Sequence, residues 1–206
     1  KSPLLHNPKK KSGSWHLVLS LLNNSNIIES DLSLVAEMNR TIRVIPDFPK
    51  QGILFRDITP LFYNQGLCSK MANAIIDQMT EKPDAVAGIE SRGFLLGMLI
   101  ANKLDVPFVL MRKAGKLPGP VLRTDYSLEY GTAALEVQND AIAPNWKVMI
   151  HDDLLATGGT AAAAAELTKM SNAHVSSFSF LVELANLKGN NQLKNYSNTI
   201  ICLTQY

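Results

Sequence analysis

Apolar residues recur at helical spacing in the part of the chain that follows residue 29. The apolar positions of residues 32–42 share one helical face, which predicts a helix that begins at Ser30 and ends before Pro46. Residues 67–79 repeat this spacing and predict a second helix, whereas residues 52–60 show no clear period. We therefore expect two helices before the rest of the fold.

Short apolar runs alternate with helical segments from residue 85 onward. The runs predict strands at residues 85–89, 107–111, 147–150 and 175–182, and the segments predict helices at 93–103 and 161–167. This alternation is typical of an α/β fold in which helices flank a central parallel sheet. Residues 114–145 interrupt it and contain several glycines and prolines. Because long insertions in compact domains commonly serve as lids, we expect these residues, called the hood below, to form a flexible loop over a ligand site.

Composition supports a globular protein. The chain has 206 residues, 46% of them hydrophobic, which is enough for one domain with a full core. Residues 1–29 are polar and lysine-rich with no sustained period. We expect them to form a loose N-terminal extension, and residues 30–206 to form a single domain. The acid-free residues 1–28 leave an organelle-targeting segment open, although they contain no arginine.

Charge and cysteine content narrow the function classes. The net charge is +2, but residues 1–28 hold four lysines and no acid, so the remainder carries 16 basic and 18 acidic residues. That balance gives no reason to expect a nucleic-acid partner. Cys68 and Cys202 have no metal-binding or disulfide spacing, which favours the reducing cytoplasm. No apolar run approaches the roughly 20 residues that a membrane span needs, so no membrane partner is expected.

Residues 148–160 combine an apolar run, two carboxylates and a small-residue turn before a helix, which is typical of a phosphosugar site. The helix N-terminus would offer free N–H groups and a positive dipole end to a phosphate. Gly158 and Gly159 allow close backbone approach, and neighbouring threonine hydroxyls add donors. Asp152 and Asp153 suit sugar hydroxyls or a hydrated Mg²⁺.

Charged residues follow three of the predicted strands. Residues 90–92, 112–113 and 152–153 each come at a strand end, and open parallel sheets bind ligands along that edge. We therefore expect the three segments to meet in one crevice. Gly88 and Gly93 have the spacing of half a P-loop, but Phe-Leu follows in place of Lys-Ser/Thr, which argues against a P-loop NTPase. The absence of Gly-x-Gly-x-x-Gly argues against a dinucleotide-binding Rossmann domain.

Five segments resemble, in family order, the type I phosphoribosyltransferases, and most closely their adenine-specific members. They are residues 46–60 (PDFPKQGILFRDITP), 88–94 (GIESRGF), 111–120 (MRKAGKLPGP), 126–131 (YSLEYG) and 148–160 (VMIHDDLLATGGT). The resemblance implies a purine-salvage reaction in which adenine N9 joins C1 of phosphoribosyl pyrophosphate (PRPP) through an oxocarbenium-like transition state, giving AMP and pyrophosphate. It also implies Mg²⁺, held by the substrate's pyrophosphate and ribose hydroxyls without a firm protein ligand, and a homodimer.

The same resemblance implies the role of each site residue. The ribose-phosphate part of PRPP would contact Asp152, Asp153, Ala156, Thr157, Gly158, Gly159 and Thr160, and the pyrophosphate would contact Ser91, Arg92, Arg112, Lys113 and Lys116. Backbone atoms of Leu54 and Arg56 would read adenine, with Phe55 stacked on its ring and Leu154 on the other face. Glu129 would handle the adenine proton, next to Tyr130 on the hood, and Arg92 would also be catalytic. A cis peptide is implied between Glu90 and Ser91.

The chain departs from the family pattern at a few positions. His151 stands where an apolar β-branched residue is usual, and we expect it to be buried and hydrogen-bonded rather than catalytic. Thr132 replaces a lysine, and Glu90 replaces an aspartate while keeping the charge. Three alternatives stay open: a transferase for hypoxanthine or guanine, a PRPP-binding regulator without turnover, and a pure interaction protein. Residues 1–29 show no helix-turn-helix pattern of the kind often fused to such regulators.

Overall fold

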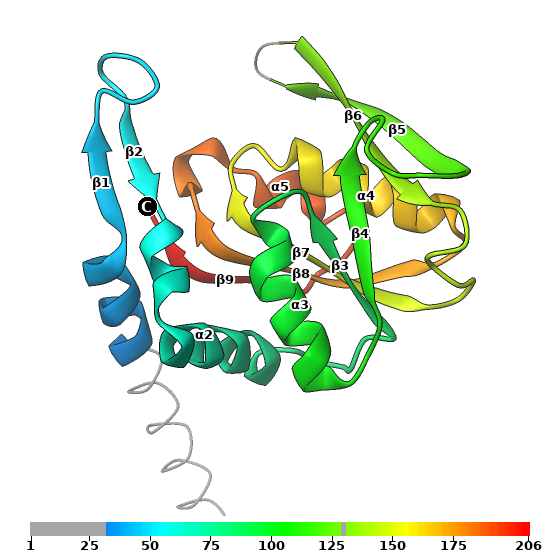
Figure 1. Cartoon of the computed structure of the whole chain (residues 1–206), viewed down its shortest axis with the longest axis horizontal. Coiled ribbons are helices and arrows are strands. Elements are labelled where there is room, and N and C mark those ends of the chain that lie inside the picture. Colours follow the sequence, from blue (N-terminus) through cyan, green and yellow to red (C-terminus); the bar gives the residue numbers. More distant parts are fainter. Residues whose placement is uncertain (1–31, 129–130) are drawn as a thin grey trace, which may run out of the picture.

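The structure is a computed structural model that describes residues 32–128 and 131–206. Its main sheet has seven strands in the order β5-β6-β4-β3-β7-β8-β9 (Figure 1). They are β3 (Ala85–Ile89), β4 (Phe108–Lys113), β5 (Val121–Leu128), β6 (Gly131–Gln138), β7 (Lys147–Leu155), β8 (His174–Glu183) and β9 (Ile200–Gln205). The helices are residues 32–41, α2 (Gln65–Asp77), α3 (Gly93–Leu104), α4 (Gly159–Met170) and α5 (Asn190–Leu193), with short 3₁₀ turns η1 (Thr59–Tyr63) and η2 (Ala185–Leu187).

The centre of the sheet is parallel, as the sequence predicts. β3 pairs in parallel with β4 and β7, and β8 continues the parallel series to β9. Every residue of β3 is buried, which is why its sequence reads as a continuous apolar run. The prediction of an α/β fold with a central parallel sheet is confirmed.

Helices cover both faces of this sheet and form two hydrophobic clusters. On one face, residues such as Met38, Met71 and Ile100 place the helix at 32–41, α2 and α3 in one cluster. On the other face, α4 covers the central strands (Figure 1), and its Ala164 and Leu167 pack with the opposite side chains of those strands. None of the helices in residues 32–128 and 131–206 has the length and apolar character of a membrane span.

The hood contains two strands that the sequence analysis missed. β5 and β6 pair antiparallel from Val121↔Gln138 to Leu128↔Gly131, and β6 joins the main sheet beside the end of β4. Except for Gly131, the first residue of β6, the glycines and prolines of the hood lie outside these strands, while Leu135 and Val137 of β6 are buried. The hood is therefore a hairpin that extends the sheet rather than a loop without secondary structure.

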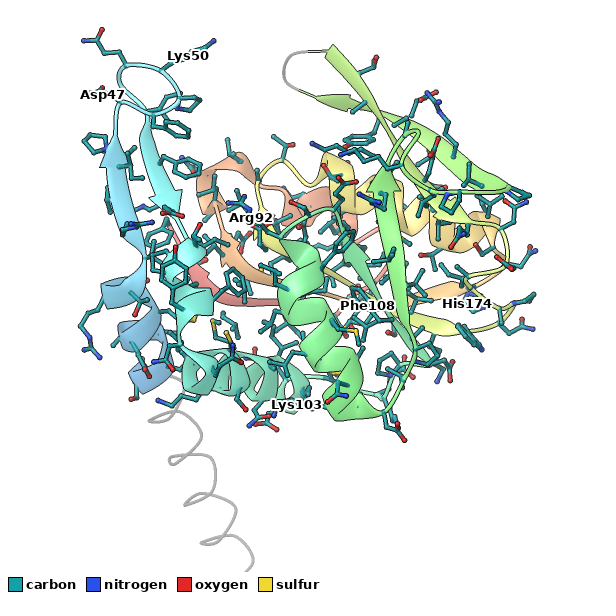
Figure 2. All side chains as sticks on the ribbon, viewed as in Figure 1. Asp47, Lys50, Arg92, Lys103, Phe108 and His174 are labelled. Carbon is teal, nitrogen blue, oxygen red and sulfur yellow. The ribbon has the colours of Figure 1, made fainter. Side chains whose placement is uncertain are left out.

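A second hairpin stands apart from the main sheet. β1 (Arg43–Pro46) and β2 (Leu54–Asp57) pair antiparallel as a two-stranded sheet, and Asp47 and Lys50 lie at its tip (Figures 1 and 2). These strands and β9 were not predicted. β1 and β2 are short and largely exposed, so they carry little periodicity, whereas β9 is short but is buried or half-buried at every position except Gln205. The expected N-terminal extension, residues 1–29, lies outside the described residues.

Candidate active site

The carboxyl ends of β3, β4 and β7 bring the predicted charged segments to one edge of the sheet. β3 lies between β4 and β7, and all three run in the same direction. β7 is longer than expected: it continues past Ile150 to Leu155, so Asp152 and Asp153 belong to the strand itself. The three segments therefore meet, as the expected crevice requires.

An ion pair joins the turn after β3 to the end of β7. Arg92 Nη2 lies 2.9 Å from Asp153 Oδ2, and the Asp153 side chain is only 8% exposed while that of Arg92 is 40% exposed. Figure 2 shows Arg92 at the start of α3, at the sheet edge. The preceding Glu90–Ser91 peptide is cis, as expected, and Ser91 is exposed in the turn. Asp153 can thus fix the guanidinium while part of it stays open to a ligand.

Close packing of this turn against β7 requires a glycine. A Cβ at Gly93 would lie 2.8 Å from the His151 backbone oxygen and 3.0 Å from Asp152 Oδ1. Such approaches are shorter than real Cβ contacts, so a larger residue would push the turn away from the strand. Gly93 therefore keeps Arg92 within reach of Asp153.

Asp152 differs electrostatically from an ordinary aspartate. Removal from water, and then the neighbouring Asp153 carboxylate, raise the pKa of Asp152 well above its usual range. Its Oδ1 accepts the Asp153 backbone N–H at 2.9 Å. Asp152 therefore keeps a proton to higher pH than an exposed aspartate would.

Residues 156–158 form the loop between β7 and α4, and Gly159 and Thr160 begin the first turn of α4. Gly158 caps α4 at φ 86°, a conformation that favours glycine. Asp152 and residues 154–161 line a small cavity of about 70 Å³. The loop thus collects the predicted phosphate-binding residues Ala156, Thr157, Gly158, Gly159 and Thr160 beside Asp152 and Leu154, with helix N–H groups available to an anion.

The loop is supported from outside by residues that the sequence analysis missed. A Cβ at Gly158 would lie 2.6 Å from the Gly189 oxygen, and one at Gly189 would overlap the Ala156 oxygen. Gln192 Nε2 also donates to the Thr157 oxygen at 2.6 Å. In the sequence, the one sign of this support is Gly189, which directly precedes the short α5. Nothing in the sequence connects Gly189 with the loop after β7.

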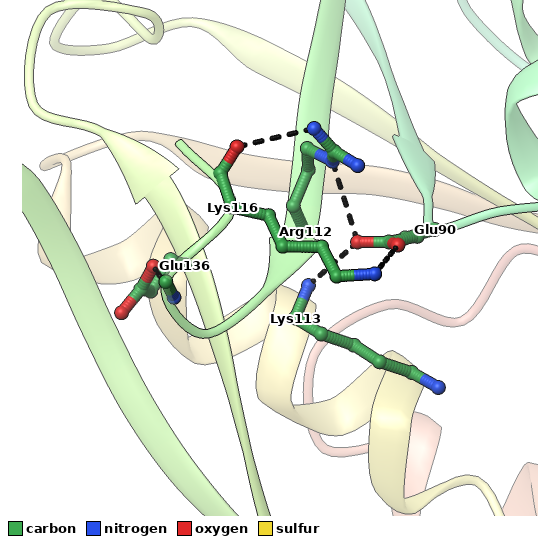
Figure 3. Close-up of polar contacts among 6 residues, drawn as sticks. Glu90, Arg112, Lys113, Lys116 and Glu136 are labelled. Atoms are coloured by element: carbon green, nitrogen blue, oxygen red, sulfur yellow. Dashed lines mark hydrogen bonds and ion pairs between the residues drawn. The ribbon is translucent and has the colours of Figure 1, made fainter. Parts of the chain in front are cut away.

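Glu90 gathers the cations at the end of β4 (Figure 3). Its Oε1 lies 2.7 Å from Lys116 Nζ, and its Oε2 lies 3.3 Å from Arg112 Nε and accepts the Lys113 backbone N–H at 3.0 Å. Arg112 Nη1 in turn donates to the Lys116 backbone oxygen at 3.1 Å. Burial alone would raise the pKa of Glu90, but Lys116, the Lys113 amide and Arg112 together lower it. Glu90 is therefore a charged anchor for this loop.

Glu136 completes the loop that follows β4. It is buried in β6, and its Oε2 accepts the Gly115 backbone N–H at 2.8 Å. The Lys113 side chain extends away from Glu90 (Figure 3), so Lys113 meets Glu90 through its backbone only. Three predicted cations, Arg112 and Lys113 at the end of β4 and Lys116 in the loop that follows, therefore meet at Glu90. From the sequence, Glu90 is notable only for keeping the charge of an aspartate.

The segment predicted to read the base lies on β2. Leu54 is 63% exposed, and the Phe55 ring packs edge-to-face on Phe48 with ring centroids 5.0 Å apart. Arg56 lies over the Tyr206 ring, 4.0 Å from its centroid. Leu154, expected on the other face of the base, is half-buried near the end of β7.

His151 is buried, as expected. Its Nδ1 lies 2.8 Å from Ser179 Oγ, and its side chain is fully enclosed. Burial lowers the pKa of His151 to about 4, so the ring is neutral at physiological pH. Its Nε2 has no hydrogen-bond partner among the described residues.

Sequence comparison identifies the family. A model of the phosphoribosyl transferase domain matches residues 63–199 of the chain. The adenine phosphoribosyltransferase of Cytophaga hutchinsonii is 45% identical over 178 residues, which cover 86% of this chain and 98% of that protein. The chain belongs to the adenine phosphoribosyltransferase family.

Solved adenine phosphoribosyltransferases share the fold. The enzyme of Thermoanaerobacter pseudethanolicus superposes with a TM-score of 0.79 at 42% identity, covering 84% of this chain and 99% of that chain. The enzyme of Saccharomyces cerevisiae, solved in complex with an imino-altritol bisphosphate and adenine, gives a TM-score of 0.76 at 40% identity over 82% of this chain and 97% of that one. The resemblance inferred from five motifs is therefore confirmed.

Two residues of the expected adenine phosphoribosyltransferase site are not described. Glu129 and Tyr130 lie outside the described residues, between Leu128 and Gly131 in the sequence. Within residues 32–128 and 131–206, no group of three or more His, Cys, Asp or Glu side chains is placed to hold a metal ion.

Proposed function

We propose that the protein catalyses the transfer of the phosphoribosyl group of PRPP to N9 of adenine, which gives AMP and pyrophosphate. The observation that carries this proposal is the meeting of three elements at one sheet edge: the Arg92–Asp153 ion pair, the loop at residues 156–160 and the Glu90-anchored loop after β4. The adenine bound to the Saccharomyces cerevisiae relative supports the choice of base.

The proposed reaction builds positive charge on the ribose while pyrophosphate leaves. Preorganised cations that face the leaving group stabilise such a transition state. Arg92, Arg112, Lys113 and Lys116 would supply them, with Ser91 beside Arg92. Mg²⁺ on the substrate's pyrophosphate and ribose hydroxyl oxygens would neutralise part of the remaining charge.

The ribose phosphate would sit in the loop from Ala156 to Thr160, against the N–H groups of α4. Adenine would be read by the backbone of Leu54 and Arg56, stacked on Phe55 and bounded by Leu154. Glu129, with Tyr130 beside it, would handle the adenine proton after closure of the hood.

The proposal extends to the state of the protein. We infer that residues 30–206 act as one domain with residues 1–29 as an extension, that the enzyme is a homodimer, and that it works in the cytoplasm without a nucleic-acid or membrane partner. Size-exclusion chromatography with light scattering tests the dimer directly, because a monomer would scatter with half the mass of a dimer.

The deciding experiment is AMP formation by the purified protein from adenine, PRPP and Mg²⁺, with hypoxanthine and guanine in parallel. Asp153→Asn should lower turnover by about 100-fold, the scale of losing one preorganised charge-stabilising group. Asp77→Asn, which changes an exposed carboxylate at the end of α2, serves as the matched control. Use of another purine would refute the base assignment, and PRPP binding without turnover of any purine would favour the regulator.

A further inference from the structure

The segment proposed to read adenine has little support of its own. β1 and β2 pair only with each other, and isolated two-stranded hairpins are at best marginally stable in water. Large side chains of the hairpin stay exposed, among them Val44 at 49%, Phe48 at 50% and Leu54 at 63%. The orientation of the hairpin must therefore depend on specific contacts with the rest of the protein.

One such contact joins the middle of β2 to the residue after β9. The Arg56 guanidinium carbon lies 4.0 Å from the centroid of the Tyr206 ring, well inside the roughly 6 Å range of a cation–π interaction. Arg56 pairs with Val44 across the hairpin. Because the two strands are paired at this position, a contact that holds the Arg56 side chain restrains both strands.

Tyr206 is itself held at several points. Its N–H donates to the Glu183 oxygen and its C=O accepts the Ala185 N–H, both at 2.9 Å. Its hydroxyl donates to Asn39 Oδ1 at 2.6 Å, which ties the ring to the helix at residues 32–41. The ring also packs against the core cluster on that face of the sheet. Tyr206 thus joins the end of β8, the core and β2.

We propose that Tyr206 is a positioning residue for base recognition: its ring fixes Arg56, so that the backbone of Leu54 and Arg56 faces the bound adenine. This inference rests on the proposed function, because the adenine contact of β2 is part of it. Tyr206 needs no contact with either substrate in this role, and PRPP binding at the main sheet edge should not depend on it.

Steady-state kinetics with both substrates test the proposal. Tyr206→Ala should raise KM for adenine about 3- to 30-fold, the range of a cation–π contact, and should leave KM for PRPP within about twofold. Tyr206→Phe keeps the ring and should stay close to wild type. If Tyr206 acts through Arg56, then Arg56→Ala and Tyr206→Ala should not be additive, and the double variant should resemble the worse single variant.

Hydrogen exchange of residues 43–57 gives a second readout that needs no turnover. Exchange of these amides should rise in Tyr206→Ala and not in Tyr206→Phe. Tyr63→Ala, which removes a 74% exposed ring from η1, the turn that follows β2 in the chain, should leave it unchanged. An equal rise in KM for both substrates, additive effects, or unchanged exchange in Tyr206→Ala would overturn the proposal. If the wild type makes no AMP, the proposed function fails, and the exchange result still decides whether Tyr206 holds the hairpin.

Discussion

The backbone contact between Gly158 and Gly189 predicts that the loop between β7 and α4 depends on Gly189, which is not among the proposed ligand-binding residues. Gly158 has φ 86°, and a Cβ added there would also meet the Gly189 oxygen. Gly189 has φ −60°, which any residue can adopt, so an added Cβ there meets only the steric limit set by the Ala156 oxygen. Gly52 has φ 85° with open space around a Cβ. The series Gly52→Ala, Gly189→Ala and Gly158→Ala therefore separates backbone strain, steric overlap and their combination.

The magnitudes follow from the two constraints. A left-handed conformation costs an alanine about 1–2 kcal/mol, and reduced freedom of the unfolded chain returns about 0.4–1 kcal/mol, so Gly52→Ala should destabilise by about 1 kcal/mol. Overpacking costs about 1–3 kcal/mol, and the upper part of that range applies to Gly189 because the overlapping atom is a backbone oxygen. We expect a net loss of about 2 kcal/mol for Gly189→Ala and, with both costs present, about 3 kcal/mol for Gly158→Ala.

Thermal unfolding and PRPP kinetics measure the two consequences. At roughly 2–4 °C per kcal/mol for a chain of this size, Gly189→Ala should lower Tm by about 4–8 °C and Gly52→Ala by about half as much. Gly189→Ala should also raise KM for PRPP about tenfold, because the displaced loop misaligns its N–H groups, whereas Gly52→Ala should not change it. If Gly189→Ala is no more destabilising than Gly52→Ala and keeps the wild-type KM for PRPP, the supporting role of Gly189 is refuted.

Three further predictions concern charges and thiols. Glu90→Gln should raise KM for PRPP about tenfold, the scale of one charge-assisted contact, because Lys116 and Arg112 lose the carboxylate that holds them. Glu90→Asp keeps the charge and should retain more activity. Equal losses in the two variants would contradict the anchoring role of Glu90. The hydroxyl and amide of Thr59, followed by Arg43, lower the pKa of Asp57 from 3.8 to about 2. The stability that Asp57 contributes is therefore present above about pH 4 and lost toward pH 2, so the Tm difference between wild type and Asp57→Asn should shrink over that range. Burial, and then Glu183, raise the pKa of Cys202 to about 12, so its thiol should react with a disulfide reagent at pH 8 only after unfolding.

The limits of sequence prediction are clearest in β7. Its apolar run ends at Ile150, and the periodicity therefore predicts a strand of that length. The strand continues to Leu155 because its backbone goes on pairing with β8, through Asp152↔Phe180 and Leu154↔Val182. Hydrophobic patterning reads side chains, and the polar residues His151, Asp152 and Asp153 interrupt the apolar run of this strand. The polar residues of the proposed site thus conceal the strand that positions them.

The central strands and the motif residues could be predicted because each carries a local signal: buried runs for β3, and glycine, threonine and acid spacing for the loop after β7. Residues that hold the site in place carry no such signal. Glu90 acts on cations more than 20 residues away in the chain, and Gly189 and Tyr206 meet their partners only after the fold has formed. When a single sequence is read without its relatives, such residues look like ordinary surface or core positions. A family motif therefore predicts which residues face a ligand, whereas the contacts of the folded chain are needed to predict which substitutions away from the ligand weaken its binding.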